Sequence, residues 1–134
     1  MNIIFVSDDL RDADFFGREL KRFIPEIRVD VSPHTRDALV HLAKPGRYDV
    51  ILLGTSVSSA EAVYLTTTVR NEKIPVGIVA LLGANEMNAP EELSGAGADG
   101  FVHKRADFVP ALAEALLQAK ERHYRAPAAP ASAQ

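Results

Sequence analysis

The sequence predicts an α/β fold in which five parallel strands form a doubly wound sheet with helices on both faces. Two observations favour this class. Short runs typical of strands alternate, five times, with stretches whose apolar residues recur at helical spacing. Two of these runs, 50–53 and 76–82, contain no polar residue, which is typical of strands buried on both faces of a parallel sheet.

The chain opens with a predicted strand over 3–6 and a helix over 10–24. Asp8 or Asp9 is the expected N-cap of this helix, and Pro25 is its expected stop. Four apolar residues at helical spacing are expected to face the core. They are Ala13, Phe16, Leu20 and Phe23.

A second strand is predicted over 28–31, where polar and apolar residues alternate as in an exposed edge strand. The helix predicted over 35–43 directs Ala38, Leu39 and Leu42 inward and ends at the Pro45-Gly46 pair. The central strand then runs from about Asp49 to Leu53.

Ser58 and Glu61 have the spacing of a capping box, which predicts a helix from there to about Glu72. A fully apolar fourth strand is expected over 75–82. Asn88 is the expected cap of a short helix that holds Pro90 in its first turn.

The segment 95–100 matches G-x-G-x-x-G, but it leaves a helix and enters a strand, which is the reverse of the nucleotide-binding context. We therefore interpret it as a turn before a short fifth strand over 101–103.

Asp107 is the expected cap of a last helix that reaches about Tyr124. Its expected core residues are Phe108, Leu112, Ala115, Leu116 and Ala119, and its basic end holds Lys120, Arg122 and Arg125.

Right-handed crossovers reduce the topology to a flavodoxin-like sheet with strand order 2-1-3-4-5. Ligands of such folds bind outside the C-terminal ends of the strands, where the strand order switches. The predicted crevice is lined by Asp8, Asp9, Gly54 and Thr55 and by the ends of strands four and five.

Length, charge and cysteine content exclude several classes of function. The 134 residues suit one domain, and the net charge of −3 gives no global basic footprint for nucleic acid. The absence of cysteine excludes disulfides and thiolate chemistry. The N-terminal apolar run is too short for a signal peptide or a membrane span, so we expect a soluble, cytoplasmic protein.

We expect a domain over 1–125 followed by a different kind of segment. Residues 126–134 are Ala, Pro, Ser and Gln, a composition that cannot build a core and favours an extended, semi-stiff chain. Two interpretations stay open: a frayed tail, or the start of a linker to a further domain.

Four local patterns stand out in this order: the strand that ends in Ser7-Asp8-Asp9, the run 48–54, the Ile74-Pro75-Val76 start of the fourth strand, and the segment 97–104. Together they resemble the receiver domain of two-component response regulators, over residues 1 to about 124.

The resemblance implies chemistry at five positions. In the family, an aspartate after the third strand accepts a phosphoryl group, an acidic pair helps it to hold Mg²⁺, and a lysine pairs with it. Here the acidic pair is Asp8 and Asp9 and the lysine is Lys104. The family's aromatic switch residue matches Phe101, and the phosphoacceptor position is Gly54.

This chain departs from the family at its working positions. Gly54 has no side chain and cannot be a nucleophile. The family's Thr or Ser on the fourth strand falls at Ala80 or at Leu82, and neither has a hydroxyl. Arg105 replaces the usual proline, so we expect a trans peptide bond there. These departures predict a pseudo-receiver that keeps the fold without phosphotransfer.

Asp8 and Asp9 could still hold a metal ion, although the third carboxylate is missing. We expect instead that one of them caps the first helix and the other pairs with Lys104. Thr55 and Ser56 are weak substitutes for the phosphoacceptor, because no histidine lies near them in the sequence to activate a hydroxyl. The four histidines show no metal-ligand spacing.

Two functions remain. The leading hypothesis is a non-catalytic signalling domain that contacts a protein partner, or itself, through the fourth helix, fifth strand and fifth helix. The alternative is a regulatory domain that binds a metal or small ligand in the vacated crevice, with Gly54 leaving room beside Asp8, Asp9, Thr55 and Lys104. An enzyme has little support, because the chain has no nucleophile elbow, P-loop or metal triad.

Overall fold

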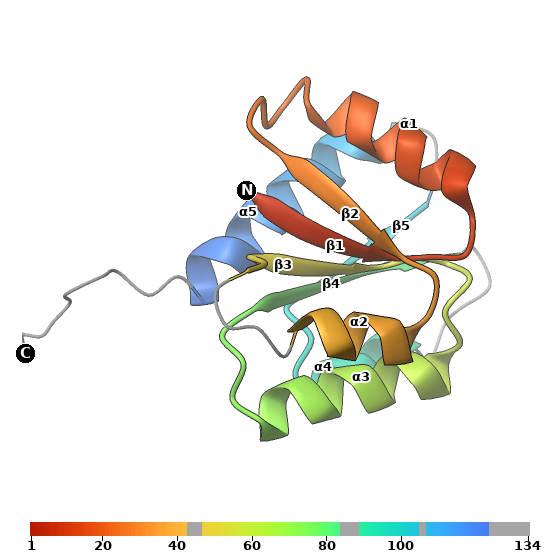
Figure 1. Ribbon diagram of the computed structural model, residues 1–134, viewed down its shortest axis with the longest axis vertical. Coiled ribbons are helices and arrows are strands. Elements are labelled where there is room, and N and C mark those ends of the chain that lie inside the picture. Colours follow the sequence, from red (N-terminus) through yellow and green to blue (C-terminus); the bar gives the residue numbers. More distant parts are fainter. Residues whose placement is uncertain (43–46, 84–88, 105–106, 124–134) are drawn as a thin grey trace, which may run out of the picture.

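The computed structural model describes residues 1–42, 47–83, 89–104 and 107–123 (Figure 1). Within them, five parallel strands form one sheet in the order β2-β1-β3-β4-β5, as predicted. The strands are β1 (Asn2–Val6), β2 (Arg28–Ser32), β3 (Val50–Leu53), β4 (Gly77–Leu82) and β5 (Gly100–His103).

Helices cover both faces of this sheet. Figure 1 shows α1 and α5 on one face and α2, α3 and α4 on the other. Their bounds are α1 (Leu10–Leu20), α2 (Thr35–Leu42), α3 (Ser59–Asn71), α4 (Ala89–Ala96) and α5 (Val109–His123). None of these helices is long and apolar enough to cross a membrane.

Side-chain alternation along the strands divides the core into two clusters. Ile3 and Phe5 pack with α1 and α5, whereas Ile4 and Val6 pack with α2, α3 and α4. The β3 strand is fully buried because both of its faces are covered. This explains its unbroken apolar run. The edge strand β2 is partly exposed, as predicted.

The first helix is shorter than predicted, and one of its expected core residues is wrong. It ends at Leu20, after which the N–H of Phe23 donates to the Leu20 carbonyl at 3.0 Å. This tighter turn rotates the chain, so that Phe23 is 48% exposed and Ile24 is buried in its place.

The predicted cap of the last helix is also wrong. α5 begins at Val109, and the Phe108 carbonyl accepts the N–H of Leu112 at 2.9 Å. Phe108 therefore occupies the N-cap position, and its ring packs edge-on against Phe16 at 5.7 Å between centroids. Asp107 lies one residue earlier, with a φ of +59°.

The turn before β5 is confirmed. α4 ends at Ala96 and β5 begins at Gly100, with Gly97 at a φ of +117°. Several expectations lie outside the described residues. They concern Ala43, Pro45-Gly46, Asn88, Arg105, Tyr124, Arg125 and the segment 126–134.

Candidate functional site

The C-terminal ends of β1 and β3 bring the predicted site residues together. Val6 pairs with Leu53 in the sheet, so that Ser7 and Gly54 follow side by side. The N–H of Asp8 donates to the hydroxyl of Ser56 at 3.4 Å, which links the two loops. The predicted neighbourhood of the acidic pair and the glycine is therefore correct.

Gly54 is enclosed by the end of β1. Its N–H donates to the Val6 carbonyl at 2.9 Å. A Cβ built on Gly54 would lie 2.9 Å from the Val6 carbonyl oxygen and 3.1 Å from both a ring carbon of Phe5 and the Cβ of Ser7. Backbone atoms cannot yield as a flexible side chain can. The space directly at this Cβ position is therefore occupied by the end of β1, and a side chain there would require its neighbours to shift.

A small cavity adjoins this position. It measures about 10 Å³ and is lined by described residues that include Gly54, Ala80 and Leu82. A single water needs about 10–15 Å³ of such volume. This cavity is therefore at most the size of a single water, and its lining residues include neither the acidic pair nor Lys104.

Asp9 caps the first helix, as expected for one member of the acidic pair. The N–H of Arg11 donates to its Oδ1 at 2.9 Å, and the Arg11 Nε lies 3.5 Å from the same oxygen. The backbone N–H of Arg11 is the main cause that lowers the pKa of Asp9 below its ordinary value. The Asp9 carboxylate thus serves as the N-cap of α1.

Lys104 does not pair with the second acid. Its Nζ lies 3.3 Å from Oδ2 of Asp12, in the first turn of α1, while Asp8 is exposed. The reason is topological: α1 covers the same face as α5, so its first turn lies beside the end of β5. Among the described residues, no three His, Asp or Glu side chains form a potential metal site.

The sheet register distinguishes Ala80 from Leu82, the two positions at which the family's Thr or Ser was expected to fall. Ala80 pairs directly with Phe101, whereas Leu82 pairs with His103. Ala80 is therefore the position that adjoins the aromatic residue. It is buried and offers only a methyl group. Phe101 is half-buried and packs against the α2/α3/α4 side of the core.

A charged cluster at the opposite end of the sheet was missed by the sequence reasoning. Asp99 accepts from the Arg70 Nη2 at 2.9 Å and from the Ile78 N–H at 2.8 Å, and its other oxygen lies 2.8 Å from the His123 Nε2. Burial is the main cause that lowers the pKa of Arg70. The cluster joins α3, β4 and α5 across long stretches of sequence, so no local signal identifies it.

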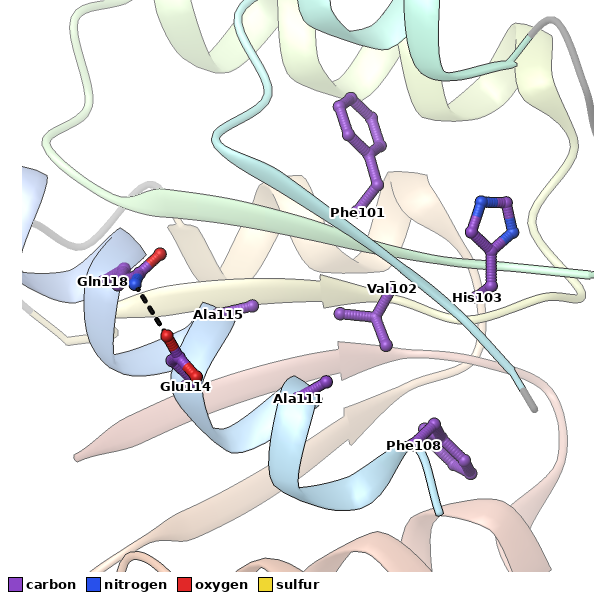
Figure 2. Close-up of a pocket in the computed structure, with 8 residues that line it drawn as sticks. All are labelled: Phe101, Val102, His103, Phe108, Ala111, Glu114, Ala115 and Gln118. Carbon is purple, nitrogen blue, oxygen red and sulfur yellow. Dashed lines mark hydrogen bonds between the residues drawn. The ribbon is translucent and has the colours of Figure 1, made fainter. Parts of the chain in front are cut away.

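A groove lies between β5 and α5, with a volume of about 460 Å³. Figure 2 shows Val102 and Phe108 near its floor, with Ala111 and Ala115 on the facing side of α5. Phe101 and His103 point to the other face of β5 in the same view. Glu114 and Gln118 form a polar rim and are hydrogen-bonded to each other at 3.2 Å. From the sequence, Phe108 and Ala115 were expected in the core, and Ala111, Glu114 and Gln118 were not singled out.

Solved structures with this arrangement include response regulators. A receiver domain protein of Clostridium thermocellum has a TM-score of 0.76 at 14% identity, over 90% of this chain and 94% of that chain. A chemotaxis response regulator of Vibrio cholerae has a TM-score of 0.67 at 20% identity, over 92% and 98% of the two chains. A LuxR family DNA-binding response regulator of Silicibacter pomeroyi has a TM-score of 0.74 at 24% identity, over 97% and 99%.

No protein-family model and no curated protein matches the sequence. At these identities the structural likeness establishes the fold alone. The chain has the flavodoxin-like fold of response-regulator receiver domains.

Proposed function

We propose that this protein is a non-catalytic receiver-like signalling domain that works through protein–protein contacts, independently of aspartyl phosphorylation. One observation carries the proposal: the position of the family's phosphoacceptor is Gly54, and the Val6 carbonyl and Phe5 ring occupy the space of a side chain there. A nucleophile restored at this position would have to displace the Val6 carbonyl, so that refilling it costs packing energy.

The other working positions support the same function. Ala80 provides no hydroxyl to read a phosphoryl group, and it adjoins Phe101 directly. Lys104 is paired with Asp12, and Asp9 is engaged as a helix cap. Lys104 and Asp9 thus each have a structural partner in place of a catalytic one.

The proposed contact surface consists of α4, β5 and α5. Its centre is the groove between β5 and α5, where an apolar floor meets the rim of Glu114 and Gln118. An apolar centre with a polar rim is the usual anatomy of a protein–protein interface. Since Ala80 cannot couple a phosphoryl group to Phe101, this surface is proposed to be constitutively available.

Mass spectrometry tests the phosphorylation-independent part. The protein is incubated with Mg²⁺ and a small acyl phosphate, and its intact mass is measured beside that of a receiver domain that has the aspartate. The expected result is an unchanged mass for this chain and a phosphoryl adduct for the control. A stoichiometric adduct on this chain, mapped to Asp8 or Asp9, would overturn the proposal.

The alternative of a ligand in the vacated crevice loses its motivating observation. That observation was the room left by the missing side chain, whereas the Val6 carbonyl and the Phe5 ring lie within 3.1 Å of the Cβ position of Gly54. No second function is therefore proposed.

A further inference from the structure

The strand β2 forms one outer edge of the sheet. Among the described strands it pairs only with β1, at the opposite end of the sheet from β5 (Figure 1). The Arg28 N–H donates to the Met1 carbonyl at 2.7 Å, so the backbone of Arg28 faces β1. Because backbone groups alternate in direction along a strand, Val29 and Val31 direct their N–H and C=O groups away from β1. This edge can therefore pair with another strand.

The side chains along this edge carry complementary charges. Arg28 and Asp30 are exposed and lie two residues apart, so they project from the same face of the sheet. Charges of a single sign at such positions would keep a second copy of the strand away. Opposite signs attract in one arrangement. When two copies of β2 run antiparallel about Val29, Arg28 of each copy lies directly opposite Asp30 of the other.

This register also satisfies the backbone. The two copies of Val29 form a hydrogen-bonded pair, in which each N–H donates to the carbonyl of the other copy. Arg28 and Asp30 then form the adjacent non-hydrogen-bonded pairs, in which the Cα atoms are only about 4.5 Å apart and the side chains are closest. Asp30 is already oriented, because the Tyr48 hydroxyl donates to its Oδ2 at 2.7 Å. The ion pairs within the described part of the chain include neither Arg28 nor Asp30.

A groove beside this edge leaves space for a second copy. It lies between α1 and β2, has a volume of about 720 Å³ and is lined in part by Gly17, whose Cβ position has no atom within 4 Å. Its α1 wall carries Asp14 at one end and Lys21 two turns further along the helix. A groove with one sign of charge would suit an oppositely charged peptide. Both signs on one patch suit a two-fold contact, in which the patch meets itself.

We propose that two copies of this chain associate through antiparallel pairing of their β2 strands, about a two-fold axis at Val29, and so join their sheets into one. Because β5 lies at the other end of the sheet, this dimer would leave α4, β5 and α5 of both copies exposed. The presentation of two contact surfaces rests on the proposed function, whereas the β2 contact itself does not.

Charge reversal tests the pairing. Arg28→Asp places like charges opposite each other at both cross-strand pairs of the dimer, and so does Asp30→Arg. Each variant alone is expected to raise the dimer dissociation constant at least about tenfold, as measured by sedimentation equilibrium. An equimolar mixture of the two variants is expected to recover the association, because every cross-strand pair then joins opposite charges.

Arg36→Asp is the matched control for Arg28→Asp. Arg36 is exposed on α2, away from the β2 edge, and its reversal changes the net charge by the same amount. This variant is expected to leave the dissociation constant unchanged. An equal loss of association in Arg36→Asp and Arg28→Asp would mean that net charge, and not the β2 pairing, controls association, which would overturn the proposal.

A backbone variant keeps the test decisive if Asp30→Arg fails to fold without its contact to Tyr48. Val29→Pro removes the central N–H donor on the solvent side of an edge strand, where proline is tolerated. It is expected to abolish the dimer while circular dichroism shows an unchanged fold. Arg28→Asp, which removes no described side-chain contact, gives the second measurement.

Three further results would overturn the proposal. They are a monomer at every concentration up to the millimolar range, a dimer that persists in both Arg28→Asp and Val29→Pro, and a mixture of the two folded charge variants that stays monomeric. A dimer that is lost instead on Ala115→Glu would place the contact at α5. None of these results depends on the acyl phosphate experiment, so the β2 contact and the proposed function can fail separately.

Discussion

The Val6 carbonyl oxygen lies 2.9 Å from the place that a Cβ on Gly54 would occupy, and it also accepts the Gly54 N–H at 2.9 Å. The two strands approach so closely at this point that a side chain on the residue after β3 would require the backbone of β1 to shift. Gly54 thus lacks a nucleophile and also fits the close approach of β1 and β3.

Gly54→Ala is expected to destabilise the protein by about 1–3 kcal/mol, because the added methyl group has to displace backbone. Gly17→Ala is the matched control: nothing lies within 4 Å of its Cβ, and it sits inside α1. That variant is expected to gain up to ~1 kcal/mol from helix propensity. Urea unfolding of both variants measures the difference, and equal stabilities would contradict the packing argument.

Gly54→Asp is expected to restore at most weak phosphorylation. The new side chain meets the Val6 carbonyl and the Phe5 ring, and Ala80 still offers no hydroxyl to the phosphoryl group. The measurement is intact mass after incubation with Mg²⁺ and acyl phosphate, on a sample shown to be folded by circular dichroism. Efficient, stoichiometric phosphorylation of this single variant would mean that the site is far less closed than its packing indicates.

Arg70→Ala is expected to cost about 3 kcal/mol of unfolding free energy, because it removes the Nη2 that lies 2.9 Å from the buried Asp99 carboxylate. Arg122→Ala is the control. This arginine is 66% exposed and lies 3.6 Å from the same carboxylate, so its loss is expected to cost less than ~1 kcal/mol. Similar losses in the two variants would rule out Arg70 as the dominant partner of Asp99.

The pair of Lys104 and Asp12 is expected to contribute little to stability. Their side chains are 36% and 28% exposed, and such pairs couple by about 0.2–1 kcal/mol. A double-mutant cycle with Lys104→Ala and Asp12→Ala measures this coupling. A value well above ~1 kcal/mol would indicate that the lysine has kept a role at the site beyond this surface pair.

Acid is expected to weaken the protein partly through Asp9. Its pKa is lower in the folded state than in the unfolded state, so its contribution is present above the unfolded pKa of about 3.9 and is lost as the pH falls through the folded value. Asn also caps helices, so Asp9→Asn keeps the cap and removes the titration. Unfolding at pH 5 and pH 3 should show a smaller acid-induced loss in the variant, and an unchanged loss would assign the effect to other carboxylates.

Local patterns were sufficient for most of the fold. The apolar runs of β3 and β4 follow from burial on both faces, and the spacing of Ser58 and Glu61 marks the start of α3, where the Glu61 N–H donates to the Ser58 hydroxyl at 3.2 Å. Helix ends were less predictable. The tight turn after Leu20 exposes Phe23, and the packing of Phe108 shifts the start of α5, because tertiary contacts compete with local capping.

The sequence by itself determined which chemistry is absent: Gly54 has no nucleophile, and neither Ala80 nor Leu82 has a hydroxyl. Only the tertiary structure decided that the space at Gly54 is filled, that Lys104 turns to Asp12, and that Arg70 and Asp99 meet at the far end of the sheet. The physical reason is the same in each case. Residue identity fixes what a position can donate, accept or attack, whereas the contacts that close or engage it come from segments distant in sequence, which only the packed sheet and helices bring together.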